Sequence, residues 1–306
     1  MGMSVLVSGA SGFVGSHLAA ALAGRGYDVR AMTRRPDSYH GPGRAVRGDV
    51  GDPDSLSAAL SGVHAAYYLV HSLGSADFAD KDVQGARNFA DGCARAGLDR
   101  IIYLSGLGNE NAALSRHLRS RRDVEQALRS GPVPVTVLRA AVVIGHGSIV
   151  WEITRQLVDH LPGVVTPQWV ETRTQPISVG DVVRYLVGVL EPEEARGASY
   201  EIGGADVLRY LDMLQRTAEI QDRRLPNLSV PLLTPRLSAK WLALVTDVDT
   251  STADNLVDSM TNEMVVREQS INDLVPGEVL GFDEAARQAL TECAKAPRGT
   301  HTRSGR

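Results

Sequence analysis

Cysteine is nearly absent from this sequence of 306 residues, which contains only Cys93 and Cys293. Two cysteines cannot form a disulfide framework, nor can they supply the four ligands of a zinc site by themselves. The chain also has little excess charge, because 32 basic and 36 acidic residues give a net charge of −4. This balance argues against a general electrostatic attraction to nucleic acid, so we expect no nucleic-acid partner.

Long apolar runs are missing as well. No stretch approaches the roughly 20 apolar residues that a transmembrane helix needs, and the N-terminus lacks the basic and apolar parts of a signal peptide. We therefore expect a cytoplasmic protein without a transmembrane segment. Neither a cluster with metal-ligand spacing nor a Gly-x-Ser-x-Gly nucleophile motif occurs, so we expect no bound metal and no acyl-transfer chemistry.

Short apolar runs alternate with helix-like segments through the first half of the chain. The pattern predicts strands at 4–8, 27–32, 45–47, 65–70, 100–104 and 135–138. Helices are predicted between them at 14–22, 55–60, 82–96 and 119–128. Strands that alternate with helices indicate right-handed crossovers and a parallel sheet with helices on both faces. The expected fold class is α/β, a doubly wound Rossmann sheet with a smaller C-terminal substrate-side region.

The second half is less regular, with helices predicted at 150–160, 182–190 and 282–293. We expect a Rossmann domain at residues 1–145, a mixed C-terminal region at 146–293, and a small, polar, basic tail at 294–306 that is disordered. The stretch at 228–245, amphipathic at 237–245, leaves three alternatives: a lid over a substrate pocket, a peripheral contact with a membrane surface, or a contact with a hydrophobic partner. Its sparse charge favours the lid.

A glycine-rich turn, Gly9-Ala-Ser-Gly12-Phe-Val-Gly15, joins the first strand to the first helix. Glycines permit a close approach of the backbone to a pyrophosphate, and the following helix presents free N–H groups to it. The strand–turn–helix context favours dinucleotide binding over a turn without a ligand. The contacts are expected from Gly9, Ser11, Gly12, Phe13, Val14 and Gly15.

The residues after the second strand select between the two nicotinamide cofactors. NAD-binding proteins usually place Asp or Glu there, whereas this chain has Thr33-Arg34-Arg35. A guanidinium group can hold a 2′-phosphate with two hydrogen bonds. We therefore expect NADP(H) to be preferred over NAD(H), with Arg34 as the main contact and Arg35 either a second contact or ordinary surface.

Two further loops are expected to border the cofactor. Asp49, followed by Val50 after the third strand, can accept a hydrogen bond from the adenine amino group, and Asp52 or Asp54 would serve that role too.

The other loop follows the fourth strand and contains Val70, His71 and Ser72. It lies at the carboxyl edge, where open α/β sheets bind ligands. His71 either lines the nicotinamide pocket or is a satisfied core histidine.

Together these motifs resemble the short-chain dehydrogenase/reductase superfamily in its extended or atypical branch, from about residue 4 to 190. Gly-xx-Gly-xx-Gly is that branch's form of the loop, and Asn88 in a helix and Ser105 after the fifth strand are similar to its pattern. The segment Gln175-Pro-Ile-Ser-Val-Gly-Asp181 resembles its substrate-side segment. More narrowly, the sequence is similar to an NAD(P)H-binding subgroup related to NmrA-like sensors and the NADPH-binding accessory subunit of respiratory complex I.

The resemblance implies an NAD(P)-binding site and a catalytic serine, Ser105, but one family feature is missing. Active members relay a proton with a Tyr-xxx-Lys pair; here His117 and Arg121 stand in its place, and Glu125 supports this alignment. Histidine can relay a proton near neutral pH, whereas arginine keeps its charge. His117 is therefore either a relay or a surface histidine without chemistry. Tyr103 is a poor substitute, because we expect its place inside the strand to aim it off the site.

Two functions are consistent with these residues. The first is an oxidoreductase that uses NADP(H) to reduce a small apolar carbonyl or alkene substrate. Ser105 would orient the substrate, His117 would supply the proton and Arg121 would hold the cofactor ribose. The missing Tyr-xxx-Lys pair favours the alternative, a non-catalytic NADPH-binding sensor or accessory protein that acts through a protein partner.

Overall fold

The computed structural model describes residues 2–71, 78–108, 113–160, 164–166, 168–229 and 246–295. Ser72, residues 230–245 of the stretch at 228–245 and residues 296–306 of the predicted tail lie outside these ranges. Within them, no helix is long and apolar enough to cross a membrane. The described side chains of His, Cys, Asp and Glu also form no group that could hold a metal ion.

Among the described residues, a central sheet has seven parallel strands in the order β11-β6-β5-β4-β1-β2-β3. They are β1 (Ser4–Ser8), β2 (Asp28–Thr33), β3 (Arg44–Arg47), β4 (Ala65–Tyr68), β5 (Arg100–Gly106), β6 (Val135–Ala140) and β11 (Ser199–Ile202). The chain builds outward from β1 to β3 and then crosses back to β4, which pairs with the other side of β1. This reversal opens a crevice at the carboxyl ends of the strands, where doubly wound sheets bind ligands. The predicted α/β doubly wound fold is confirmed.

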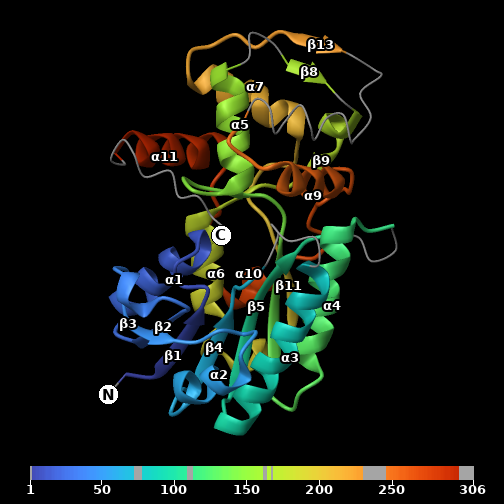
Figure 1. Ribbon diagram of the computed structural model, residues 1–306. Coiled ribbons are helices and arrows are strands. Elements are labelled where there is room, and N and C mark those ends of the chain that lie inside the picture. Colours follow the sequence, from blue (N-terminus) through green and yellow to red (C-terminus); the bar gives the residue numbers. More distant parts are fainter. Residues whose placement is uncertain are drawn as a thin grey trace.

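Helices cover both faces of this sheet (Figure 1). α1 (Phe13–Gly24) and α6 (Val179–Gly188) pack on one face, and α2 (Pro53–Leu60), α3 (Phe78–Ala96) and α4 (Arg116–Arg129) pack on the other. In α4 the buried Val124 and Leu128 are four residues apart, so they share the side of the helix that faces the sheet. Full burial of such a side chain stabilises the fold by roughly 1.5–3 kcal/mol.

The other described elements lie mostly beyond the carboxyl edge of the sheet and form a second region (Figure 1). Its helices are α5 (Ile149–His160), α7 (Tyr210–Ile220), α9 (Thr250–Met260) and α11 (Phe282–Lys295). Its short strands are β7 (Val143–Ile144), β8 (Val164–Thr166), β9 (Arg173–Thr174), β10 (Ile177–Ser178), β12 (Leu208–Arg209) and β13 (Asn227–Ser229). The short α10 (Ile271–Leu274) packs beside β11, and 3₁₀ turns occur at Pro36–Ser38, Gln168–Glu171 and Glu193–Ala195.

One apolar core fills the second region and reaches the Rossmann part. Trp151 of α5 and Tyr210 of α7 are buried in it together with Leu107, which follows β5, and Leu118 of α4. The second region is therefore packed against the end of β5 and the start of α4, beside the ligand-binding edge of the sheet.

Candidate functional site

The glycine-rich turn between β1 and α1, residues 9–15, exposes backbone groups with few side chains around them. This turn is called the glycine cradle. Gly9 has a left-handed φ of +71°, and a Cβ atom there would lie 2.9 Å from the carbonyl oxygen of Leu69. A Cβ atom at Gly15 would collide with the carbonyl oxygen of Gly9. Both positions therefore require glycine, in agreement with the motif.

The start of α1 is open to an anion. Gly12 precedes the helix and provides no side-chain cap, and the first turn contains no acidic residue. The first amide groups of the helix thus keep their hydrogen-bonding capacity and the positive end of the helix dipole. Ser11 and Gly12 are exposed, while Phe13 and Val14 are half-buried along the same turn. This arrangement fits a pyrophosphate.

The loop after β7 lies against this turn through Phe13 and is held by a carboxylate. Glu152 Oε1 lies 2.9 Å from His146 Nδ1 and accepts a hydrogen bond from the Gly147 amide at 3.0 Å. Gly147 has a φ of +91°, which explains a glycine at this position.

Arg34 and Arg35 follow β2 with exposed side chains. Neither guanidinium group forms an ion pair with another residue in the described part of the chain. The Arg35 amide donates to Thr33 Oγ1 at 3.2 Å, and Ser38 Oγ donates to the Arg35 carbonyl oxygen at 3.1 Å, so the turn itself is ordered locally. This edge of the sheet carries positive charge that faces solvent.

The loop after β3 is held from two sides. Asp49 Oδ1 accepts a hydrogen bond from the Gly51 amide at 2.9 Å, and the Asp49 amide donates to Ser55 Oγ at 2.9 Å. Asn88 of α3 donates from Nδ2 to the Val50 carbonyl oxygen at 2.8 Å. Asn88 thus fixes the loop after β3, which is expected to contact the adenine. The sequence did not reveal this role.

Ser8 ties β1 to the end of β4. Its Oγ donates to the Tyr67 carbonyl oxygen at 2.8 Å and accepts from the Leu69 amide at 3.2 Å. Sequence reasoning missed this residue, and the available signal was a serine that ends an apolar strand directly before Gly9. Of the residues expected after β4, Val70 is half-buried and His71 is exposed.

The predicted reactive residues come together at the carboxyl end of β5. Ser105 is 4% exposed, and its Oγ has no hydrogen-bond partner among the described residues. His117 and Arg121 are four residues apart on α4 and share one side of the helix. A Cβ atom at Gly106 would lie 3.7 Å from Arg121 Cγ, so the Arg121 stem lies beside the end of β5. A buried hydroxyl without a partner costs free energy unless a ligand supplies one.

The positive charge of Arg121 acts on two histidines. Burial and this charge lower the pKa of His117 to about 3. Desolvation of the imidazole ring and the charge of Arg121 lower the pKa of His71 as well. Both imidazoles are therefore neutral near pH 7, and each offers one N–H donor and one acceptor nitrogen. His117 can donate a hydrogen bond, but it holds no extra proton.

The expected direction of Tyr103 is wrong. Residues two apart on a strand share a face, so Tyr103 points to the same side as Ser105. Its hydroxyl donates to the Arg121 carbonyl oxygen at 3.4 Å. The ring is fully buried, and burial raises the pKa of the hydroxyl. Tyr103 therefore supports α4 from within the core.

Glu125 links α4 to β6. Its carboxylate lies 2.9 Å from Arg139 Nη2, 3.2 Å from Arg122 Nη1 and 3.6 Å from Arg129 Nε. Arg122 also donates to the Gly108 carbonyl oxygen at 3.1 Å, just after β5. The residue that supported the family alignment thus fixes the helix of His117 to the sheet.

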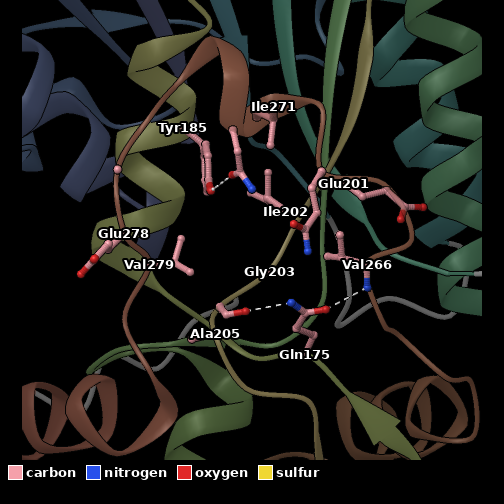
Figure 2. A pocket seen from close by; sticks show the side chains of 14 residues that line it. Gln175, Tyr185, Glu201, Ile202, Gly203, Ala205, Val266, Ile271, Glu278 and Val279 are labelled. Atoms are coloured by element: carbon pink, nitrogen blue, oxygen red, sulfur yellow. Dashed lines mark hydrogen bonds between the residues drawn. The ribbon is translucent and has the colours of Figure 1, made fainter.

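A cavity of about 400 Å³ lies apart from these residues (Figure 2). Gln175 closes one side by donating to the Gly204 carbonyl oxygen at 2.8 Å and accepting from the Val266 amide at 3.0 Å. Tyr185 donates to Asn272 Oδ1 at 2.8 Å on the opposite side. None of the predicted site residues lines this cavity.

Comparisons with known proteins agree with this geometry. The model of a family described as NAD(P)H-binding matches residues 9–190. A ceramide reductase from Caulobacter vibrioides is 33% identical over 152 residues, 47% of each chain. A (4-alkanoyl-5-oxo-2,5-dihydrofuran-3-yl)methyl phosphate reductase from Streptomyces griseus is 34% identical over 139 residues, 44% of this chain and 46% of the relative. The aligned part thus spans just under half the length of these curated relatives.

The fold extends over almost the whole chain in solved structures. An NADPH-dependent quinone oxidoreductase from Escherichia coli, solved with NADPH, superposes with a TM-score of 0.76 at 18% sequence identity, over 94% of this chain and 99% of that one. The predicted NAD(P)-binding family is confirmed by the family model, and the solved structure confirms the fold. The chain belongs to the NAD(P)H-binding family.

Proposed function

We propose that this protein is an NADP(H)-dependent reductase of a small apolar carbonyl or alkene compound. The observation that carries the proposal is the meeting of an open glycine cradle with Ser105, His117 and Arg121 at one edge of the sheet. Membership of an NAD(P)H-binding family and two relatives named as reductases support it.

The preference for NADP(H) rests on the end of β2. Arg34 and Arg35 are exposed, have no described ion-pair partner and replace the acid that would repel a 2′-phosphate. A guanidinium–phosphate pair is bidentate and charge-assisted, and such hydrogen bonds are roughly twice as strong as neutral ones. When bound, NADPH supplies a hydride to the acceptor carbon.

The chain's own residues orient the acceptor and manage its proton. Ser105 Oγ–H, which lacks a partner in the described structure, donates to the substrate oxygen. Neutral His117 offers a second N–H, and Arg121 stabilises negative charge on that oxygen. Because its pKa is about 3, His117 passes on its proton only when water delivers another to its second ring nitrogen.

The apolar nature of the substrate is inferred from the apolar side chains packed beside this edge. Leu107 and Leu118 belong to the same buried apolar core as Trp151. A strongly polar substrate would have few hydrogen-bond partners next to this core.

A second candidate is a non-catalytic NADPH-binding sensor that acts through a protein partner. The specific observation in its favour is the His117–Arg121 pair, in which Arg121 helps to keep His117 neutral where active family members carry an acid.

The test is NADPH oxidation by purified protein with a panel of ketones, aldehydes and enones. The enzyme proposal predicts turnover that falls about 10²- to 10⁴-fold in His117→Ala. Asp123→Ala, at an exposed position of the same helix whose side chain has no described hydrogen-bond partner, serves as the matched control. Tight NADPH binding without turnover by any member of the panel would favour the sensor.

A further inference from the structure

The start of α4 is fixed by side chains from a distant part of the chain. Asp258 of α9 accepts a hydrogen bond through Oδ2 from the Arg116 amide at 2.9 Å. Asn262, just after α9, accepts through Oδ1 from the Ser115 amide at 2.8 Å and donates through Nδ2 to the Ala113 carbonyl oxygen at 2.9 Å. These three contacts join the second region to the first turn of the helix that carries His117.

The first amides of a helix have no partner within the helix, so outside acceptors decide where the helix begins. Ser115 Oγ accepts from the Leu118 amide at 3.1 Å, and Asp258 accepts from the Arg116 amide. His117 lies between these two capped positions. Its place in space therefore depends on one acceptor from its own helix and one from α9.

The contact between α4 and α9 is buried at its centre. Ser115 and Ser259 are 5% and 7% exposed, and their Oγ atoms are 3.5 Å apart. The polar contacts of Asp258 and Asn262 lie around this buried centre, so a shift of α9 moves the start of α4 with it.

We propose that Asp258 and Asn262 are positioning residues, which set the start of α4 and thereby the place of His117 and Arg121 relative to Ser105. The inference rests on the proposed function for the chemistry of His117, while the contacts themselves do not depend on it. The second region thus contributes to the reactive geometry without supplying a reacting group.

The experiment compares Asp258→Ala and Asn262→Ala with Asp258→Asn, which keeps an acceptor oxygen but loses the charge. The matched control is Asp254→Ala, because Asp254 lies one turn earlier on α9, is exposed and has no hydrogen-bond partner among the described residues. Three quantities are measured in the full chain: NADPH affinity, kcat and KM for the best acceptor of the panel, and amide hydrogen exchange at Arg116 and His117.

We expect Asp258→Ala to lower kcat about 10-fold, the loss corresponding to one hydrogen bond, and to speed exchange at the start of α4. NADPH affinity and KM should stay unchanged, Asp258→Asn should recover most of kcat, and Asp254→Ala should resemble the wild type. Faster exchange at the start of α4 with an unchanged kcat in Asp258→Ala would overturn the inference. It would also be overturned if Asp254→Ala lowered kcat as much as Asp258→Ala does.

Failure of the proposed function is distinguishable from failure of this inference. If no acceptor is reduced, the enzyme proposal fails, and the imidazole NMR signal of His117 then replaces kcat as the readout. A signal that shifts in Asp258→Ala and Asn262→Ala but not in Asp254→Ala supports the positioning role. A signal that stays in place in all variants refutes it. If Asp258→Ala prevents folding, Asp258→Asn and Asn262→Ser provide the same comparison.

Discussion

Phe13, in the first turn of α1, lies against Gly145, and a Cβ atom at position 145 would come within 2.8 Å of Phe13 Cζ. The same Cβ atom would lie 2.8 Å from Val179 Cγ1 at the start of α6. The loop after β7 is thus wedged between two helices, one of which carries the phosphate cradle. A side chain at 145 must displace the ring of Phe13, which belongs to the turn that receives the cofactor.

Gly145→Ala should therefore weaken NADPH binding. Overpacking of this kind costs roughly 1–3 kcal/mol of folding stability. Where it also distorts the cradle, each 1.4 kcal/mol lost from the bound state lowers the NADPH affinity about 10-fold. A fluorescence titration with NADPH measures it. Gly24→Ala is the control, because nothing lies within 4 Å of its added Cβ atom at the end of α1. Unchanged affinity in Gly145→Ala would refute the role of this contact.

The lowered pKa of His117 makes stability depend on pH. The ring binds a proton at about pH 6.5 in the unfolded chain but only at about pH 3 in the folded one. Between these values the unfolded state binds more protons, so the free energy of unfolding decreases as the pH falls from 6.5 towards 3. His117→Gln should flatten this decrease. Urea denaturation across that pH range measures it, and an equally steep decrease in the variant would contradict the assignment.

The positive charge of Arg121 should control the pKa of the His117 ring. Arg121→Gln should raise the pKa of His117 as followed by NMR, because the charge of Arg121 contributes to lowering it. Arg87→Gln removes the same charge from an exposed position of α3 without a described ion pair and serves as the control. An identical response to both substitutions would show that net charge, not the position of Arg121, controls His117.

Glu125 provides a test of stability. Its carboxylate is 9% exposed and contacts Arg122, Arg129 and Arg139, so Glu125→Gln removes the negative charge that balances these mostly buried guanidinium groups. The expected loss is about 3 kcal/mol in the free energy of unfolding. Glu193→Gln is the matched change at a carboxylate that is 70% exposed, where we expect about 1 kcal/mol or less. Similar losses in chemical denaturation would argue against the buried cluster.

The sequence predicted the first half of the fold well because buried parallel strands are continuous apolar runs. The run Val5-Leu6-Val7 is fully buried, and β1 begins and ends where the pattern predicts. β11 was not located, because Ser-Tyr-Glu-Ile at the sheet edge lacks such a run. α9 was missed as well, since it opens with Thr250, Ser251 and Thr252, which are weak helix formers that tertiary packing overrides.

In the candidate site too, local features could be predicted from the sequence and contacts between distant residues could not. The glycine cradle is local in sequence, so its spacing predicts its geometry. Contacts between distant positions leave no periodic signal: Asn88 reaches Val50, and Asp258 reaches Arg116 across 142 residues. The neutral state of His117 was also invisible, because it depends on burial and on Arg121 in the folded protein.

The most direct measurement is a calorimetric titration with NADPH and NADH on wild type, Arg34→Ala and Arg44→Ala. Arg44 is an exposed arginine at the start of β3 and acts as the control. The wild type should prefer NADPH, and Arg34→Ala should lose about 1.5–3 kcal/mol of NADPH binding, the strength of a hydrogen bond to a charged group, without a change for NADH. Equal affinity for both cofactors in the wild type would contradict the phosphate contact, and binding of neither would contradict the proposed function altogether.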